Sequence, residues 1–307
     1  MRVIYSLHDA QLTEDSVVTI GAFDGIHRGH RTILDGVRQA ALDQERASVV
    51  VTFFPHPGIV LGRADPFYLT STEEKIVLLN AIGIDLLVIM PFTLEMSRTR
   101  AADYVSMLID HLRMREMHVG RDFALGHKRE GNIDFLTRLG RERGFVVRVI
   151  DPLVNGGTPI SSSGIRRLLR EGDVAQAAAW LGHPFRLSGT VVQGDGRGRT
   201  IGVPTANLEV WQEHAIPANS VYACWAWVGN LKFKAAVNVG VRPTFTDKAV
   251  RAVEAHVLDF DRDIYGVNVA LDFVMRLRDE RRFPNFETLV AQIRMDIVKT
   301  REVLVDP

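Results

Sequence analysis

The sequence predicts an α/β chain of two unlike halves: a doubly wound parallel sheet, then an antiparallel β-barrel or sandwich with a C-terminal helix. Up to about residue 150, short β-branched runs alternate with longer segments of helical period, which is typical of a parallel sheet. From about residue 185, strand patterns follow one another with little helix between them. A chain of 307 residues has room for two such domains.

The first half is predicted to contain five strands separated by helices. Ser71 and Glu74 form a capping-box pattern directly before an apolar run, which predicts that a helix begins there. The predicted strands are residues 17–22, 48–54, 85–91, 117–121 and 145–150, and the predicted helices are residues 31–46, 72–82, 101–113 and 132–143.

The second half is predicted to contain five strands and one helix. Gly229-Asn230 lies between two of these strands and indicates a tight turn. Two short helices, residues 163–170 and 174–181, precede Gly182 and Pro184, so we expect a boundary between domains 1–184 and 185–307. The predicted strands are residues 186–192, 221–228, 233–239, 252–260 and 267–277, followed by a helix over 286–303.

The composition favours a cytoplasmic protein that acts on small molecules. Lys plus Arg and Asp plus Glu both number 37 and are interspersed, which argues against nucleic acid or an anionic membrane as partner. The single cysteine, Cys224, excludes an intramolecular disulfide, and no apolar run approaches the ~18 residues that span a bilayer. We find no secretory segment and no sign of an obligate protein partner.

A histidine pair lies where the first predicted strand turns into a helix. His27 and His30 are three residues apart, which places both rings on one side of a first helical turn, and Gly29 leaves space for a ligand. A helix N-terminus at the carboxyl end of a strand suits a phosphate group. The alternatives are a plain helix cap and a zinc site, for which His56 is the nearest third ligand.

Three consecutive hydroxyls open a later helix. Ser161, Ser162 and Ser163 precede Arg166 and Arg167, and this combination suits anionic oxygens. Ordinary N-capping is the alternative for the serines. Together with the histidine pair, the segment favours phosphate binding.

These segments carry a resemblance to a known family. Gly21-Ala-Phe-Asp-Gly-Ile-His-Arg-Gly-His30 resembles the nucleotidylyltransferase signature, specifically that of the adenylyltransferase half of bacterial bifunctional riboflavin kinase/FAD synthetases, which implies a Rossmann-like domain. Residues 52–57, 120–126 and 160–166 resemble further motifs of that family, although Ala124 and Leu125 depart from its usual residues. The resemblance implies that ATP or its phosphates contact Gly21, Phe23, Asp24, His27, His30, His56, Ser161, Ser162, Ser163 and Arg166, and that flavin contacts Asp122 and Phe123.

A glycine-arginine loop opens the second half. Gly194, Gly196 and Gly198 alternate with Asp195 and Arg197, and Arg199 follows, so the backbone can fold around an anion. No helix follows the loop and the chain has no Walker A lysine, so the loop is neither a dinucleotide-binding fingerprint nor a P-loop.

The residues after this loop resemble riboflavin kinases. Pro204-Thr-Ala-Asn207 matches their signature, and the resemblance implies that Thr205 and Asn207 bind Mg²⁺ and nucleotide phosphates together with the Gly-Arg loop. It also implies that Glu254 is the catalytic base, and its strand pattern places Glu254 on one face with His256. Arg278 and Phe283 are the expected flavin contacts, and Ser220 replaces a usual glycine.

The resemblance extends from about residue 16 to 303 and implies two reactions. The second half would phosphorylate riboflavin with ATP and Mg²⁺, and the first half would transfer AMP from ATP to the resulting FMN, giving FAD and pyrophosphate. Two alternatives stay open. One is a nucleotidylyltransferase with another acceptor, and the other is a flavin- or nucleotide-binding regulator that has lost catalysis.

Overall fold

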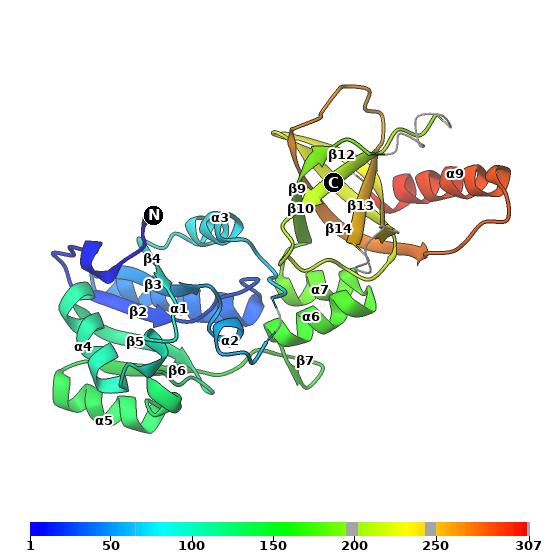
Figure 1. Ribbon diagram of the computed structural model, residues 1–307. Coiled ribbons are helices and arrows are strands. Elements are labelled where there is room, and N and C mark those ends of the chain that lie inside the picture. The colour runs from blue at the N-terminus through cyan, green and yellow to red at the C-terminus, as the bar shows by residue number, and fades with distance from the viewer. Residues whose placement is uncertain (65, 195–201, 243–249, 306–307) are drawn as a thin grey trace. The chain divides into compact units, whose positions relative to one another are not determined.

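The computed structural model describes residues 1–64, 66–194, 202–242 and 250–305 (Figure 1). The chain forms two compact units. Unit 1 comprises residues 1–66 and 70–161, and unit 2 comprises residues 67–69 and 162–307.

Unit 1 is built on a parallel sheet of six strands in the order β1-β4-β3-β2-β5-β6. The prediction of five strands is wrong because it omits the edge strand β1. This strand has only three residues, too few to show a recognisable pattern of apolar residues. The strands are β1 (Arg2–Ile4), β2 (Ser16–Ile20), β3 (Ala47–Phe54), β4 (Leu86–Pro91), β5 (Met114–Gly120) and β6 (Val146–Ile150).

Helices cover both faces of this sheet, as its buried side chains require (Figure 1). On β3, Val50 packs with α1 (Arg28–Asp43) and α3 (Thr72–Ile82), whereas Val49 and Val51 pack with α4 (Ala101–Leu112) and α5 (Ile133–Arg143). Successive residues of a strand point to opposite faces, so a run of valines becomes a strand that is apolar on both. The predicted doubly wound sheet is therefore confirmed.

The start of α3 follows the predicted capping box. The Glu74 backbone N–H donates to Ser71 Oγ at 3.1 Å, and the Ser71 N–H donates to the Glu74 carboxylate at 2.9 Å. Gly83 ends the helix with φ of 87°. Both ends agree with the predicted range of 72–82 because local signals specify each of them.

The strand order defines one crevice in the sheet. From β2 the chain passes through α1 to β3 on one side, while β5 lies on the other side of β2. Ligands of open α/β sheets bind at the carboxyl end of the strands at such a switch point. The turn from β2 into α1, which carries the histidine pair, lies there.

Unit 2 contains a closed antiparallel barrel of six strands in the order β10-β13-β12-β11-β14-β9. The sequence predicted five, because β10 is short and carries Asn207 and Glu209 after a proline. Gly229-Asn230 forms the predicted two-residue turn, with Val228 opposite Leu231. The strands are β9 (Phe185–Val192), β10 (Ala206–Val210), β11 (Ser220–Val228), β12 (Leu231–Arg242), β13 (Val250–Val257) and β14 (Asn268–Asp279).

Strand β13 ends three residues before the predicted position. Asp259 adopts φ of 56°, which turns the chain out of the barrel after Leu258. Ser220 does not have the positive φ that would explain the glycine it replaces. Its Oγ accepts a hydrogen bond from Arg276 Nε at 2.7 Å, so the buried hydroxyl at the start of β11 is paired.

Unit 2 also contains helices besides the barrel. α9 (Phe286–Val303) has the predicted bounds, and α6 (Ser162–Glu171) and α7 (Val174–Leu181) also belong to unit 2 (Figure 1). The Glu171 carbonyl accepts from Arg276 at 3.2 Å, and Val174, Ala177 and Trp180 bury the inner side of α7. The compact units therefore divide at 161/162, upstream of residue 184. The smaller elements are α2 (Pro57–Val60), β7 (Val154–Asn155) and β8 (Thr158–Pro159).

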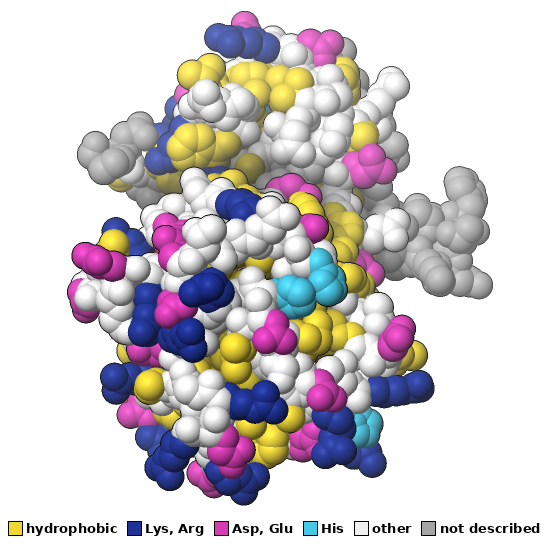
Figure 2. Space-filling view, turned by 90° about the vertical axis from the view of Figure 1, so that its left-hand side faces the viewer, with side chains coloured by type: hydrophobic (Ala, Val, Ile, Leu, Met, Phe, Trp, Pro, Cys, Tyr) yellow, Lys and Arg dark blue, Asp and Glu magenta, His cyan; other side chains and the backbone are white. Residues whose placement is uncertain are grey.

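Charged side chains of both signs are mixed on the face drawn in Figure 2. Within the described part of the chain, no helix combines the length and the apolar character needed to cross a membrane.

Candidate active sites

The histidine pair forms a compact corner at the start of α1. His27 is the N-cap residue, and its Nδ1 accepts the His30 backbone N–H at 3.2 Å. The two rings stack with centroids 3.6 Å apart, so the predicted placement on one side is confirmed. Because Nδ1 accepts, the hydrogen-bond pattern assigns the proton of a neutral His27 ring to Nε2. His27 is thus the helix cap, and its donor nitrogen is Nε2.

The loop that leads to this corner has an unusual backbone. Phe23 and Ile26 have φ of 45° and 38°, a region that residues with a side chain rarely adopt, and Gly25 between them has φ of 82°. Packing explains the glycine at position 29, since an added Cβ would lie only 3.2 Å from the His27 ring. Strain of this kind is typical of functional sites, where the surrounding structure fixes the conformation.

Hydrogen bonds of the buried Asp24 carboxylate hold this loop in place. Its side chain is 2% exposed, and Oδ1 accepts from the Thr70 N–H at 3.2 Å and from the Thr70 hydroxyl at 3.3 Å. Thr70 Oγ1 in turn accepts the Gly25 N–H at 3.1 Å. These bonds give Asp24 a bracing role, and its predicted contact with ATP stays a prediction.

Lys75 is a second buried charged residue close to the histidine corner. The sequence analysis did not predict a role for it. Its Nζ donates to the Ala22 carbonyl at 2.7 Å and lies 3.4 Å from Thr52 Oγ1. Burial lowers the pKa of Lys75 to about 8, and the nearby Asp24 carboxylate opposes that shift. The available signal was the spacing of Lys75, Leu79 and Ile82, which places a lysine on the buried side of α3.

A cavity of about 480 Å³, which we call the corner cavity, lies against the loop in unit 1. Its walls include Gly21, His56 and Phe123 of the predicted residues, together with Ala124 and Leu125. Asp122 is exposed and is not among the lining residues. Further lining residues that the sequence did not suggest are Arg63, Phe92, Tyr104, His127, Lys128 and Arg129.

The serine segment crosses the division between the compact units. Ser161 belongs to unit 1, where the carbonyl of the preceding Ile160 lies 3.5 Å from the position of a Cβ on Gly29. Ser162 and Ser163 form the first turn of α6 in unit 2, and Arg166 Nε donates to the Phe67 carbonyl at 2.7 Å. Their meeting with the histidine corner stays a prediction.

In unit 2, three polar residues form one row across the barrel wall. Glu254 on β13 lies opposite Asn207 on β10 and opposite Asn238 on β12. Directly opposed residues of neighbouring strands share a face, so these side chains project to the same side. Asn207 also packs against Gly194, where an added Cβ would overlap the Asn207 amide. The sequence missed Asn238, a polar residue among the apolar residues of β12.

Two cavities of unit 2 share Thr205. The helix cavity, about 530 Å³, lies along α9 and includes Thr205, Glu254, His256, Arg278 and Phe283 among its walls. The loop cavity, about 390 Å³, is lined by Thr205, by small and β-branched residues of the barrel and by residues 260–265. Predicted kinase residues from four separate segments thus come together around the helix cavity.

An ion pair, a cation–π contact and a hydrogen bond connect the walls of the helix cavity. Arg278 makes a bidentate pair with the buried Asp296 of α9, with N–O distances between 2.8 and 3.1 Å. The same guanidinium lies 5.6 Å from the centre of the Phe283 ring. His256 Nδ1 donates to the Pro204 carbonyl at 2.8 Å, which braces the residue before Thr205.

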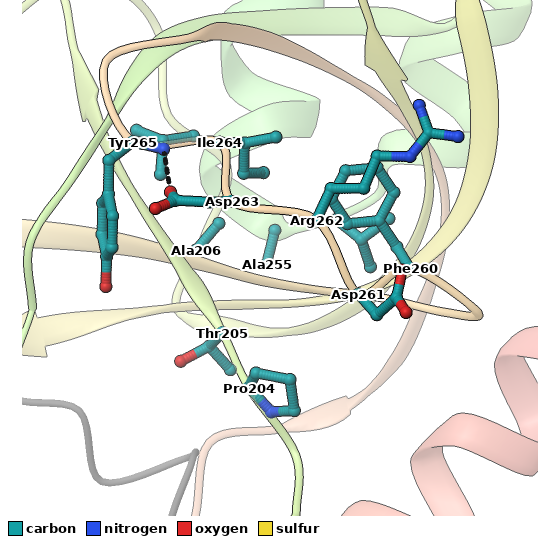
Figure 3. Close-up of a pocket in the computed structure, with 12 residues that line it drawn as sticks. Pro204, Thr205, Ala206, Ala255, Phe260, Asp261, Arg262, Asp263, Ile264 and Tyr265 are labelled. Atoms are coloured by element: carbon teal, nitrogen blue, oxygen red, sulfur yellow. Dashed lines mark hydrogen bonds between the residues drawn. The ribbon is translucent and has the colours of Figure 1, made fainter.

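Figure 3 shows the loop cavity, with Pro204 and Thr205 facing the segment that carries Phe260, Asp263 and Tyr265. The Tyr265 backbone N–H donates to the Asp263 carboxylate at 3.0 Å, which fixes the turn of this segment. Of the Gly-Arg loop, Gly194 is described, whereas Gly196, Arg197, Gly198 and Arg199 lie outside the described residues.

Comparison with known proteins identifies the family. Residues 9–164 match the FAD synthetase family and residues 181–304 match the riboflavin kinase family. The chain belongs to the bifunctional riboflavin kinase/FMN adenylyltransferases. A bifunctional riboflavin kinase/FMN adenylyltransferase of Listeria monocytogenes is 34% identical over 98% of both chains. The Escherichia coli protein of the same name is 35% identical over 98% of this chain and 97% of its own.

A crystal structure from Streptococcus pneumoniae, named as that of a macrolide-efflux protein, has a TM-score of 0.90 and 30% identity and covers 98% of each chain. This similarity supports the fold. That name is said of the Streptococcus pneumoniae protein and is not carried over to this chain. The function is that of the family, which phosphorylates riboflavin and adenylylates FMN at the expense of ATP. The FAD synthetase match of the first half, together with the riboflavin kinase match of the second, decides against a nucleotidylyltransferase with a different acceptor.

Proposed function

We propose that residues 1–184 transfer the adenylyl group and that residues 185–307 phosphorylate riboflavin. The family matches support this division, because they do not overlap and the second match begins at residue 181, close to the proposed boundary. One observation carries the kinase assignment. Thr205 lines two cavities at once, so a substrate bound in each cavity would meet its partner at this residue.

The chemistry of the walls assigns one substrate to each cavity. The loop cavity offers an apolar floor, the Phe260 and Tyr265 rings and the side chains of Asp261, Arg262 and Asp263, which suits a purine base and a ribose. The helix cavity offers the Phe283 and Phe286 rings beside Glu254, which suits a flavin with its ribityl chain. ATP phosphates would then extend towards Thr205.

Glu254 is the proposed base for the kinase step. As the ribityl oxygen forms a bond to the γ-phosphorus, the bond from that phosphorus to the bridging oxygen of ADP breaks. The hydroxyl proton passes to the Glu254 carboxylate. Asn207 and Asn238 flank Glu254 on neighbouring strands and hold this face polar within an otherwise apolar wall.

Thr205 and Asn207 fit a magnesium ion by donor type, since a hydroxyl and an amide oxygen are the hard ligands it prefers. The close packing of Asn207 against Gly194 fixes the direction of its amide. When bound with ATP, Mg²⁺ would neutralise charge on the transferring phosphoryl group.

The histidine corner is the proposed centre of adenylyl transfer. An oxygen of the FMN phosphate attacks the α-phosphorus, and the bond to the pyrophosphate oxygen breaks. The nucleophile is already an anion, so no base is needed, and the task of the protein is to position the groups and stabilise charge. His27, the N-cap residue of α1, and His30, stacked on it, are the proposed donors to the phosphates at this helix N-terminus.

The corner cavity is the proposed flavin site of this half. Its walls combine aromatic rings with Arg63, Lys128 and Arg129, which matches a flavin that carries a phosphate. Every group named for either reaction comes from this one chain, so we propose that it needs no obligate protein partner. We propose a cytoplasmic location because its one thiol, Cys224, is unpaired and buried.

Incubation with riboflavin, ATP and Mg²⁺, followed by separation of the flavins, tests the proposal. We expect FMN to appear first and FAD to follow. FMN without FAD at any enzyme concentration would contradict the assignment to residues 1–184. A chain that converts neither riboflavin nor FMN would be a binding protein that has lost catalysis.

A further inference from the structure

Lys75 occupies a position where an apolar side chain is expected. It lies on the buried side of α3, four residues before Leu79 and seven before Ile82, and only 8% of it is exposed. Burying an ammonium group is costly unless it is paired and hydrogen-bonded. Since Leu or Met would fill the same space without that cost, the charge needs a reason of its own.

Hydrogen bonds from Lys75 and Thr52 meet at one atom of the loop that leads to His27, the Ala22 carbonyl oxygen. The Ala22 carbonyl oxygen accepts from Lys75 Nζ at 2.7 Å and from Thr52 Oγ1 at 3.0 Å. Ala22 itself lines the corner cavity, five residues before His27 in the sequence. The lysine thus reaches from α3 to the backbone of the loop that delivers the histidines.

A negative charge lies beside it. Asp24 is buried in the same loop, and its carboxylate acts on Lys75 electrostatically. An unbalanced carboxylate beneath a phosphate-binding corner would repel the phosphates of ATP, and it would do so strongly because the surroundings exclude water. The Lys75 charge cancels this repulsion.

We propose that Lys75 is a positioning residue for adenylyl transfer: it holds the Ala22 carbonyl in place and balances Asp24 beneath the ATP phosphates. The inference rests on the proposed function of the histidine corner. It assigns Lys75 no contact with substrate, so the residue acts through the loop.

The charge of Lys75 is poised to change just above neutral pH. Burial lowers its pKa to about 8 against the opposing effect of Asp24. The elements around it carry further charged and titratable groups: His27 in the loop, His56 after β3, Glu73 and Glu74 on α3 itself, and Arg28, His30, Arg31, Asp35, Arg38 and Asp43 on α1. Above pH 8 the ammonium becomes neutral and no longer offsets the Asp24 charge, so adenylyl transfer should decline.

The experiment measures both activities of the full-length chain between pH 7 and 9.5 for the wild type, Lys75→Met, Lys75→Arg and the exposed control Lys232→Met. We expect Lys75→Met to lower kcat for adenylyl transfer by ~10 to ~100-fold, the scale for removing a supporting partner. Lys75→Arg should keep most of the rate and lose the decline above pH 8, because arginine stays charged. Riboflavin phosphorylation should be the same in all four proteins.

Several outcomes would overturn the proposal. Lys75→Met with the wild-type rate and pH profile would show that the charge is irrelevant to adenylyl transfer. Equal losses in Lys75→Met and Lys75→Arg, with a parallel loss of thermal stability, would make the residue structural. If Lys75→Met fails to fold, the pH profiles of the wild type and Lys75→Arg test the proposal instead. The same decline above pH 8 in both proteins would contradict it. A wild type that cannot adenylylate FMN would instead refute the proposed function.

Discussion

At the scale of single residues, the side chain proposed for each reaction also has a place in the fold. His27 caps α1 through Nδ1, and the proposed contact with phosphate uses its other nitrogen, Nε2. Glu254 sits in a strand whose neighbours Val253 and Ala255 are buried in the barrel. Substitutions at these positions must therefore keep the structural role while removing the chemical one.

His27→Asn separates the two roles of His27. Asparagine is among the best N-cap residues, so α1 should keep its stability, whereas His27→Ala should lose about 1 kcal/mol of free energy of unfolding. Both variants lack Nε2–H, and we expect adenylyl transfer to fall ~100-fold or more in each, the scale for one preorganised donor. The comparison needs kinetics with supplied FMN and a denaturation curve. A normal rate in His27→Asn would mean that His27 only caps the helix.

Glu254→Gln separates a base from a metal ligand. The amide keeps the size of the side chain and cannot accept the proton, so we expect riboflavin phosphorylation to fall ~100 to ~10,000-fold with substrate affinities nearly unchanged. Steady-state kinetics over a range of Mg²⁺ concentrations check this. Recovery of the rate in excess Mg²⁺ would identify Glu254 as a ligand of the metal instead.

At the scale of elements, the sequence predicted those that carry their own local signals. The bounds of α3 follow from Ser71, Glu74 and Gly83, and those of α9 from its periodicity. Strands β1 and β10 were missed because they have only three and five residues, and because β1 pairs with β4 and β10 with β13, which are distant in sequence. The sequence also offered Glu254 and Thr205 separately, whereas their common cavity depends on α9 and on barrel closure. Lys75 was missed because a single polar residue in a helical pattern reads as exposed.

Gly194→Ala tests how the loop after β9 supports β10. The added methyl group would displace the Asn207 amide, which fills that space. We expect the riboflavin kinase to require several-fold more Mg²⁺ for half-maximal activity, while adenylyl transfer with supplied FMN stays unchanged. A Mg²⁺ titration of each activity measures this, and an unaltered titration of the kinase would remove Asn207 from the metal site.

Stability and activity should respond in opposite directions to the charge of Lys75 on α3. Its pKa is about 8 in the folded chain and 10.5 as the ordinary value, so the unfolded chain binds more protons between these pH values. Folding is therefore penalised below pH 8, and the penalty disappears as pH rises towards 10.5. Relative to Lys75→Met, the wild type should gain free energy of unfolding between pH 7.5 and 9.5 in denaturant titrations, although adenylyl transfer declines. A pH-independent difference would show that the ammonium pays no such penalty.

At the scale of the whole molecule, the compact units and the proposed activities do not share a boundary. Helices α6 and α7 pack in unit 2 through Arg276 and the buried face of α7, while Ser162 and Ser163 of α6 are predicted to serve adenylyl transfer. Fragments 185–307 and 162–307 should therefore both form FMN and neither should form FAD. The longer fragment should melt higher because it keeps the helices that cover the barrel. Thermal denaturation and a flavin assay check both statements, and FAD from either fragment would contradict them.

The central claim is that two independent sites on one chain act in sequence, and mixing two point variants tests it most directly. Glu254→Gln should convert FMN to FAD and leave riboflavin almost unchanged, whereas His30→Ala should convert riboflavin to FMN and stop there. An equimolar mixture with ATP and Mg²⁺ should produce FAD from riboflavin, as followed by separation of the three flavins. Loss of both reactions in either folded variant, or a mixture that forms no FAD although each variant retains its own step, would contradict two independent sites.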